Sequence, residues 1–277
     1  MLLVFTPFGI VGLFKQSYNT IIIKITLIRK DSKMEETKVE EKKVKIGLAT
    51  HAFNFVDYKI AFNQEHAIAT WAKKYDMVMI GKKGLDNATA REKICEMAIE
   101  NGCTHILFLD QDHVVPVQML DLLLENKDTA MVSGLVCKKG EGFKQVAFGM
   151  DSEGRYLELN LPLDGRIYEV AVCAFGCTLV NVEKLQKLEK PWFRDTCEEF
   201  FGKKENCRSD VNLCNMFRKQ LKEKIFIDTR ILIGHDGIEF CTVVYPHNAE
   251  FIKSLLELYN QSIKLKEGQQ GFYGTTI

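Results

Sequence analysis

Residues 104–116, which read THILFLDQDHVVP, constrain the fold of this chain more than any other stretch. The run 106–109 is apolar and short, as in a strand that is buried on both faces of a sheet. It ends at Asp110-Gln111-Asp112. Open α/β sheets bind their ligands beyond the carboxyl ends of their strands, so two carboxylates at this place predict a functional site.

The two neighbouring carboxylates need a partner, because they repel each other and because desolvation raises the pKa of each. A divalent cation removes both problems. Hard oxygen ligands from few protein groups suit Mg²⁺ or Mn²⁺ that also carries substrate phosphates. The alternative is that each Asp is only a turn residue or a helix cap.

Composition excludes some classes of protein. The chain has 277 residues with 37 basic and 37 acidic side chains, and this balance argues against nucleic acid as the main partner. Nine cysteines are scattered without a CxxC pair, which argues against a zinc ribbon. Free cysteines are typical of a reducing compartment, so we expect a cytoplasmic location.

Residues 1–43 are interpreted as a poorly ordered N-terminal extension. Their two apolar runs are broken by lysines and are shorter than the ~20 residues that span a bilayer, so no stable membrane span is expected. A signal anchor stays possible. Met34 opens a plausible alternative start, followed by a charged lead-in up to Lys43.

From residue 44 the pattern alternates between strand and helix, which predicts parallel strands with right-handed crossovers. Asn87 is expected to cap the second helix, Asn101-Gly102 to end it, and Pro116 to start the third. The expected elements are strands at 45–50, 77–80, 106–109 and 130–136 and helices at 55–74, 87–100 and 116–124.

After Val136, glycines separate short apolar runs, which favours hairpins over crossover units. The region 195–206 is polar without a clear period and is expected to be a loop. The other expected elements are strands at 170–180 and 224–228 and helices at 182–188, 210–222 and 249–266.

Between about residues 44 and 237 the chain resembles the GT-A glycosyltransferases of the soluble, family-2-like bacterial and viral type. The motifs that carry the resemblance are, in order, AREKICEMAIENGCTHILFLDQDHVVP, AFGCTLV, PWF, SDVNLC and FIDTRILIGH. It implies a Rossmann-like three-layer α/β/α sandwich with a mostly parallel central sheet and a smaller mixed β region. Residues 44–136 would form the nucleotide-binding half, 137–248 the acceptor half, and 249–277 a C-terminal helix and tail.

The resemblance also implies a function, the metal-dependent transfer of a sugar from a nucleoside-diphosphate sugar to an acceptor hydroxyl with inversion. Asp110 and Asp112 match the DxD motif of the family. Asp112 would hold the Mn²⁺ or Mg²⁺, and Asp110 would contact the ribose or metal-bound water. His235 follows the apolar run ILIG, so we expect it at another strand end beside the acidic turn. There it would be a third ligand and would favour Mn²⁺; alternatively it is an ordinary loop histidine.

Further residues are assigned to the donor site by the same resemblance. Arg91, in the first turns of the second helix, would reach the nucleotide or its phosphates. Thr50 and His51 would form the base-and-ribose edge of the pocket, and Gly176 would let the backbone approach the donor sugar. The chain departs from the family at Glu92, where asparagine is usual, and at Ala174, where glycine is usual.

Asp210 would be the catalytic base that deprotonates the acceptor hydroxyl. The family usually has Glu before this Asp, and here Ser209 replaces it, which puts acceptor recognition in doubt. An Asp in a first helical turn is also stabilised by the helix dipole without any catalytic role.

Two other functions remain open. FLDQDHVV also fits the DxD pattern of haloacid-dehalogenase-like phosphatases, in which the first Asp is a nucleophile. That motif normally follows the first strand, and the later acidic pair is not evident, since GHDG offers only Asp236. The departures named above would also suit a non-catalytic nucleotide-sugar-binding module of the same fold.

Overall fold

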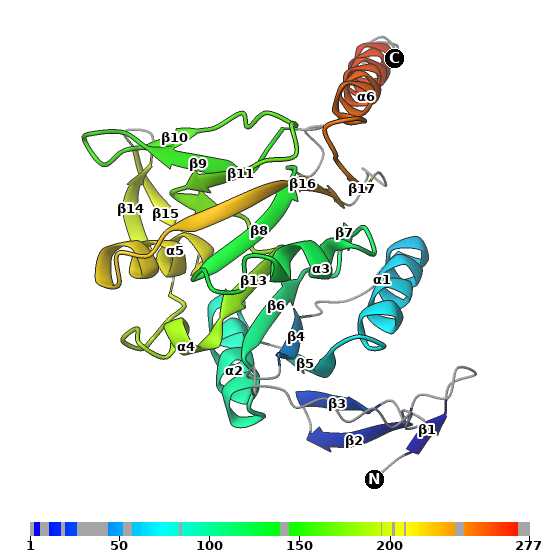
Figure 1. Ribbon diagram of the computed structural model, residues 1–277. Helices are drawn as coiled ribbons and strands as arrows, with labels where there is room; N and C mark the ends of the chain where they lie inside the picture. The colour runs from blue at the N-terminus through cyan, green and yellow to red at the C-terminus, as the bar shows by residue number, and fades with distance from the viewer. Residues whose placement is uncertain are drawn as a thin grey trace, which may run out of the picture.

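The computed structural model describes residues 3–5, 11–17, 20–26, 44–51, 57–82, 85–138, 144–194, 196–200, 203–207, 209–235 and 241–270. The side chains of residues 3–26, 51, 196–207 and 262–270 are not described. A large sheet runs through the molecule with helices on both sides (Figure 1). Its central strands, in spatial order, are β5 (Asp76–Lys82), β4 (Lys45–His51), β6 (His105–Leu109), β13 (Cys177–Asn181), β8 (Met131–Val136), β16 (Ile225–His235) and β11 (Ile167–Val170).

The direction of these strands bears on the predicted mostly parallel sheet. β4 is parallel to both β5 and β6, and β8 is parallel to β16. β13 lies between β6 and β8 and is antiparallel to both. Five strands therefore point the same way, while β13 and β11 run against them. The mixed α/β class is confirmed.

The helices form two layers, one on each face of the sheet. α1 (Tyr58–Trp71) and α3 (Met119–Leu124) cover one face, and α2 (Asn87–Glu100), α4 (Val182–Leu185) and α5 (Ser209–Gln220) cover the other. β6 shows how the faces divide, because Leu107 and Leu109 pack with α1 and α3 whereas Ile106 and Phe108 pack with α2 and α5. A strand buried on both faces explains the unbroken apolar run in the sequence.

The prediction that residues 1–43 lack regular structure is wrong for part of that range. β1 (Leu3–Phe5), β2 (Val11–Ser17) and β3 (Thr20–Thr26) continue the sheet beyond β5, with β3 antiparallel to β5. The physical reason is the isoleucine-rich segment 20–26, which has a high preference for strands and pairs with the edge that β5 presents.

Several predictions for the second half need correction. The run 170–180 is not one strand, since β12 (Val172–Cys173) joins a small separate sheet with β9 (Ala147–Met150) and β10 (Tyr156–Glu158), and β13 begins only at Cys177. The expected loop at 195–206 is a hairpin of β14 (Thr196–Phe200) and β15 (Lys203–Cys207). The strand expected at 224–228 continues through ILIGH as β16, across a register shift after Asp228.

The remaining elements are close to their predicted positions. Asp86, not Asn87, caps α2, because its side chain accepts a hydrogen bond from the Thr89 amide, and Asn101 and Gly102 end that helix as expected. α3 starts three residues after Pro116. α6 (Ala249–Gln270) is the predicted C-terminal helix. The proposed boundary between two functional halves stays a prediction.

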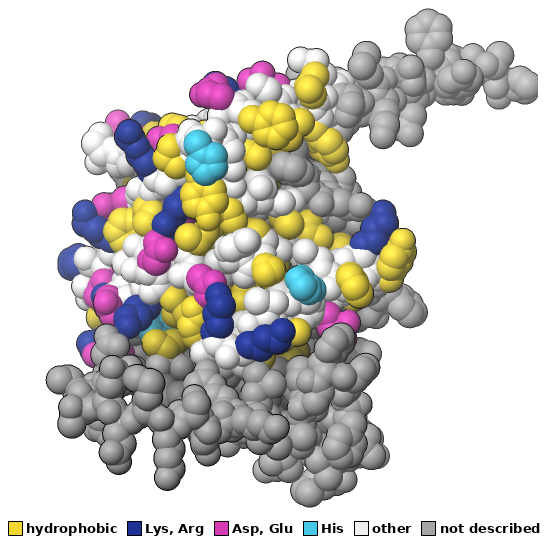
Figure 2. All heavy atoms as spheres, turned by 45° about the vertical axis from the view of Figure 1, so that its right-hand side comes forward, with side chains coloured by type: hydrophobic (Ala, Val, Ile, Leu, Met, Phe, Trp, Pro, Cys, Tyr) yellow, Lys and Arg dark blue, Asp and Glu magenta, His cyan; other side chains and the backbone are white. Residues whose placement is uncertain are grey.

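The surface gives two further findings. Among the described residues, no helix has the length and apolar character needed to cross a bilayer. On the face in Figure 2, apolar side chains are interspersed with charges of both signs.

Within the described part of the chain, seven cysteines are free, and six of them are buried.

Candidate active site

The acidic turn lies between β6 and β7 (His113–Val114) and is held by side chains of α1. Gln64 Nε2 donates to the carbonyl oxygens of Asp110 and His113, at 2.9 and 2.8 Å. Asn63 exchanges two hydrogen bonds with the backbone of Val115, and Trp71 Nε1 donates to the carbonyl of Val117. These contacts fix the turn through its backbone.

β7 brings a second strand to the same place. It pairs antiparallel with the end of β16, so that His113 stands directly opposite His235. The two imidazole rings stack, with centroids 4.4 Å apart and an interplanar angle of 20°. The prediction that His235 lies at a strand end beside the acidic turn is confirmed by this pairing.

The carboxylate of Asp112 contacts both imidazoles at their edges. Its Oδ2 is 3.2 Å from His235 Nε2, and its Oδ1 is 3.2 Å from His113 Nδ1. The imidazoles of His113 and then His235 hold the pKa of the Asp112 carboxyl well below its usual range. The carboxylate is therefore ionised at any pH at which the protein would act.

The second ring nitrogen of His235 fixes how the imidazole faces Asp112. Nδ1 lies 2.9 Å from the carbonyl oxygen of Cys137, which can only accept, so Nδ1 carries the proton. Nε2 can then donate to the Asp112 carboxylate only when the ring carries both protons, whereas in the neutral ring its lone pair can bind a metal ion. Orientation of a ligand histidine by a backbone carbonyl is usual at metal sites.

The group Asp112, His113 and His235 could hold a metal ion. One ligand atom from each lies within 4.8 Å of the other two. Metal–nitrogen and metal–oxygen bonds of ~2.0–2.2 Å bring ligand atoms to about 3–4 Å from one another, so the stacked rings would have to tilt for both imidazoles to bind one ion. Asp110 is not in this group, and its predicted contact with metal or ribose stays a prediction. The kind of metal is not determined by the group itself.

His113 was missed by the sequence reasoning, which treated it as part of the turn. Its side chain is 3% exposed, and within the described part of the chain neither ring nitrogen makes a hydrogen bond. The close approach of Nδ1 to Asp112 is therefore an electrostatic contact without hydrogen-bond geometry. The sequence contains one signal for His113. An Asp-His pair follows one apolar run, and a second histidine stands at the end of another, distant apolar run.

Gly176 lies against His113. A Cβ atom at this position would stand 2.6 Å from Nε2 and 2.9 Å from Nδ1 of the ring. The amide of Asp110 donates to the Gly176 carbonyl at 3.2 Å. The close backbone approach that the sequence predicted is present, but in these contacts it is made to the histidine ring. Contact with a donor sugar stays a prediction.

Arg91 and Asp210 come together at the start of α5. Arg91 is 6% exposed, its Nη1 donates to Ser209 Oγ at 3.1 Å, and its guanidinium lies 5.0 Å from the ring centroid of Phe175. Its Nε has no hydrogen-bond partner among the described residues. Asp210, half-buried, follows Ser209 in the first turn of the helix. Because Phe175 precedes Gly176, one short segment connects this region with the histidine pair.

The other predicted residues have these positions. Thr50 is half-buried near the carboxyl end of β4, and the side chain of His51 lies outside the described residues. Glu92, read as a departure from the family, has a structural contact, because its Oε2 accepts hydrogen bonds from the amides of Trp192 and Phe193 at 2.9 and 3.0 Å. Asp236 also lies outside the described residues.

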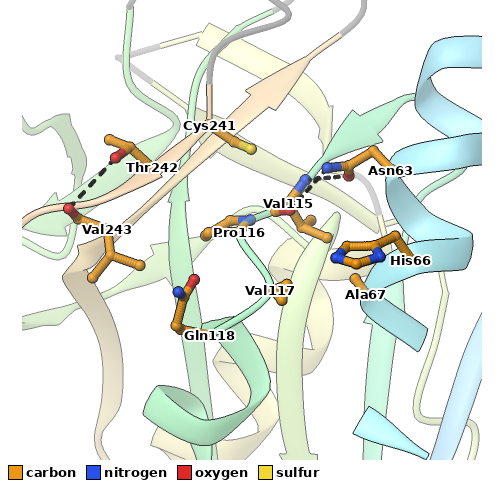
Figure 3. Close-up of a pocket in the computed structure, with 10 residues that line it drawn as sticks. All are labelled: Asn63, His66, Ala67, Val115, Pro116, Val117, Gln118, Cys241, Thr242 and Val243. Carbon is orange, nitrogen blue, oxygen red and sulfur yellow. Dashed lines mark hydrogen bonds between the residues drawn. The ribbon is translucent and has the colours of Figure 1, made fainter. Parts of the chain in front are cut away.

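A pocket of about 430 Å³ lies beside the acidic turn (Figure 3). Asn63 and His66 of α1 border it on one side, and β17 (Thr242–Val243) on the other. Val115 and Pro116 form part of its wall, so the segment that follows Asp112 and His113 also lines this pocket. Asp112, His113 and His235 themselves are not among its lining residues.

Comparisons with known proteins do not assign a family. No family model and no curated protein matches the sequence. Among solved structures, the chain is similar to A197 from STIV, with a TM-score of 0.47 and 15% identity over 72% of this chain and 94% of that one. At this score and identity the similarity carries no functional conclusion.

Proposed function

We propose that this chain is a metal-dependent glycosyltransferase that moves a sugar from a nucleoside-diphosphate sugar to an acceptor hydroxyl, with inversion. The observation that carries the proposal is the contact of Asp112 with His235 at the ends of β6 and β16. Carboxyl ends of strands in such sheets are where nucleotide ligands bind. The resemblance of the ordered motifs to GT-A enzymes supports the same function.

The residues present fit a divalent cation, with Asp112 and His235 as ligands. When bound, such a cation neutralises charge on the departing diphosphate. The chain supplies the other parts. Asp210 accepts the proton of the acceptor hydroxyl while the new bond forms between that oxygen and the anomeric carbon. The bond from the anomeric carbon to the diphosphate oxygen breaks, and its electron pair leaves with the diphosphate.

Arg91 is a positioning residue in this proposal. Its hydrogen bond to Ser209 holds the first turn of α5, from which Asp210 projects. In this proposal the guanidinium would also supply a fixed positive charge for the diphosphate. The phosphatase alternative receives less support, because the described metal-binding group has one carboxylate and two imidazoles, whereas Mg²⁺ in such enzymes prefers oxygen ligands.

The test is calorimetry and product release with a panel of nucleoside-diphosphate sugars in the presence of Mn²⁺. We expect one donor to bind only with metal and to release nucleoside diphosphate slowly. Asp112→Asn should abolish this binding, because it removes charge and keeps shape. Asp128→Asn is the matched control, since Asp128 is exposed in the turn after α3. Unchanged donor affinity in the Asp112 variant would refute the assignment.

Asp210→Asn separates catalysis from binding. Donor affinity should be retained, and transfer should fall by about 10²- to 10⁴-fold, the usual contribution of a general base. Loss of donor binding in a folded variant would show that Asp210 has another role. Binding without any release by the wild-type protein would favour the non-catalytic module.

A further inference from the structure

The buried imidazole of His113 has no role in the function proposed above. We propose that it is a third protein ligand, so that Asp112, His113 and His235 together hold a first-row transition-metal ion before any nucleotide binds. The inference rests on the metal role in the proposed function and extends it. It concerns which metal binds and when, and it is independent of the identity of the sugar donor.

The burial of His113 is the first argument. Its side chain is 3% exposed, and among the described residues both ring nitrogens lack a hydrogen bond. A buried polar group without a partner costs about 1–3 kcal/mol, so most are satisfied. Nδ1 lies 3.2 Å from Asp112 Oδ1 without hydrogen-bond geometry, and a metal ion bound at Asp112 would give one of the two nitrogens a bonded partner.

The backbone supplies the second argument, because it holds the ring where a ligand is needed. His113 is opposite His235 in the β7–β16 pair, and Gln64 donates to its carbonyl at 2.8 Å. Gly176 lies over the ring on one side, so close that a Cβ atom at this position would force the ring or the backbone to shift. The histidine is thus confined beside Asp112 by main-chain contacts that do not involve its nitrogens.

The chemistry of the donor set then favours one class of metal. Mg²⁺ prefers oxygen ligands and gives up its water reluctantly, so a site with two imidazoles and one carboxylate suits it poorly. Imidazole nitrogen suits later first-row ions such as Fe²⁺, Ni²⁺, Cu²⁺ and Zn²⁺, and Mn²⁺ is the weakest binder in that series. Three protein ligands also leave coordination positions for diphosphate oxygens. The ion should therefore be resident, not delivered with the nucleotide.

The experiment measures binding of the metal alone to the full chain, without nucleotide. Titration calorimetry compares Mg²⁺ with Mn²⁺, and pulsed electron paramagnetic resonance of bound Mn²⁺ detects coordinated imidazole nitrogen. The variant is His113→Phe, which keeps a flat ring for stacking on His235 and removes both nitrogens. His113→Asn is a second, smaller variant. His105→Phe is the matched control, because His105 is buried in β6 and hydrogen bonds to Thr104 and Lys127 instead.

We expect Mn²⁺ to bind the wild-type protein without nucleotide and to show two coordinated imidazoles. His113→Phe should show one imidazole and bind Mn²⁺ about 10- to 100-fold more weakly. At other metal sites, affinity falls by this factor when a residue that holds a ligand in place is mutated. His105→Phe should change neither result. One imidazole in the wild-type spectrum, or metal binding only when a nucleoside diphosphate is added, would overturn the inference. If the metal binds with two imidazoles but no nucleoside-diphosphate sugar of the panel binds to the metal-loaded protein, the inference is supported and the glycosyltransferase function is refuted.

Discussion

Replacing Gly176 with alanine tests the packing of the candidate site directly. The new Cβ would stand 2.6 Å from His113 Nε2 and 2.9 Å from Nδ1, far inside ordinary contact. The ring cannot rotate away freely, because it is buried and its other neighbour is the stacked ring of His235. The backbone or the ring must therefore move.

Overpacking of this kind in a core costs about 1–3 kcal/mol, and we expect Gly176→Ala to lower the free energy of unfolding by that amount. Since ~1.4 kcal/mol is a factor of ten in an equilibrium constant, a comparable displacement of the ring should weaken binding of Mn²⁺ about tenfold. Urea denaturation followed by tryptophan fluorescence measures the first effect, and calorimetry measures the second.

The control is Gly81→Ala in β5, where the nearest atom to the new Cβ is the Thr50 carbonyl oxygen at 3.6 Å. This variant should stay within about 0.5 kcal/mol of the wild-type protein. In a His113→Asn background the smaller side chain should relieve much of the Gly176→Ala penalty, which is a coupling between neighbours. Equal stability of the Gly176→Ala and Gly81→Ala proteins would refute the reasoning.

Two further predictions concern other parts of the fold. Glu92→Ala should lower the free energy of unfolding by about 2 kcal/mol, because the amides of Trp192 and Phe193 lose their acceptor. The control is Glu183→Ala at an exposed position, which should change this free energy by less than ~0.5 kcal/mol. Equal urea midpoints for the two variants would contradict this prediction. Burial raises the pKa of the Cys137 and Cys177 thiols to about 12. In the unfolded chain these thiols ionise from about pH 8.5. The stability that the folded protein gains by keeping them protonated is therefore complete below that pH, and it is lost as the pH rises toward their pKa values in the folded protein. The urea midpoint should therefore fall between about pH 7.5 and 10, and Cys177→Ala should reduce the slope; an unchanged slope in that variant would contradict the assignment.

The sequence predicted the part of the fold that depends on local pattern. The apolar run before Asp110 and the alternation of strands and helices up to Val136 are present at nearly the predicted positions. The place of Asp112 beside His235 was also predicted, since both residues follow apolar runs that end at the same edge of the sheet. Periodicity and end signals are sufficient for such inferences.

Other features depend on long-range pairing, which no local pattern encodes. An apolar run carries no direction, so the antiparallel insertion of β13 between β6 and β8 could not be predicted. The run 170–180 looked continuous, yet Gly176 must pass close to a ring contributed by β7. The position of His113 opposite His235 results from the pairing of β7 with β16, so the sequence around His113 could not predict it.

The hydrogen bonds from α1 to the loop after β6 have a consequence for substitutions in this loop. Asn63, Gln64 and Trp71 bind only main-chain groups of this loop. Substitutions at 112 and 113 would therefore leave these hydrogen bonds in place, although a change at the buried His113 would also alter its packing against Gly176 and His235. The ligand atoms offered at this turn can thus differ while the same three side chains hold the backbone that presents them.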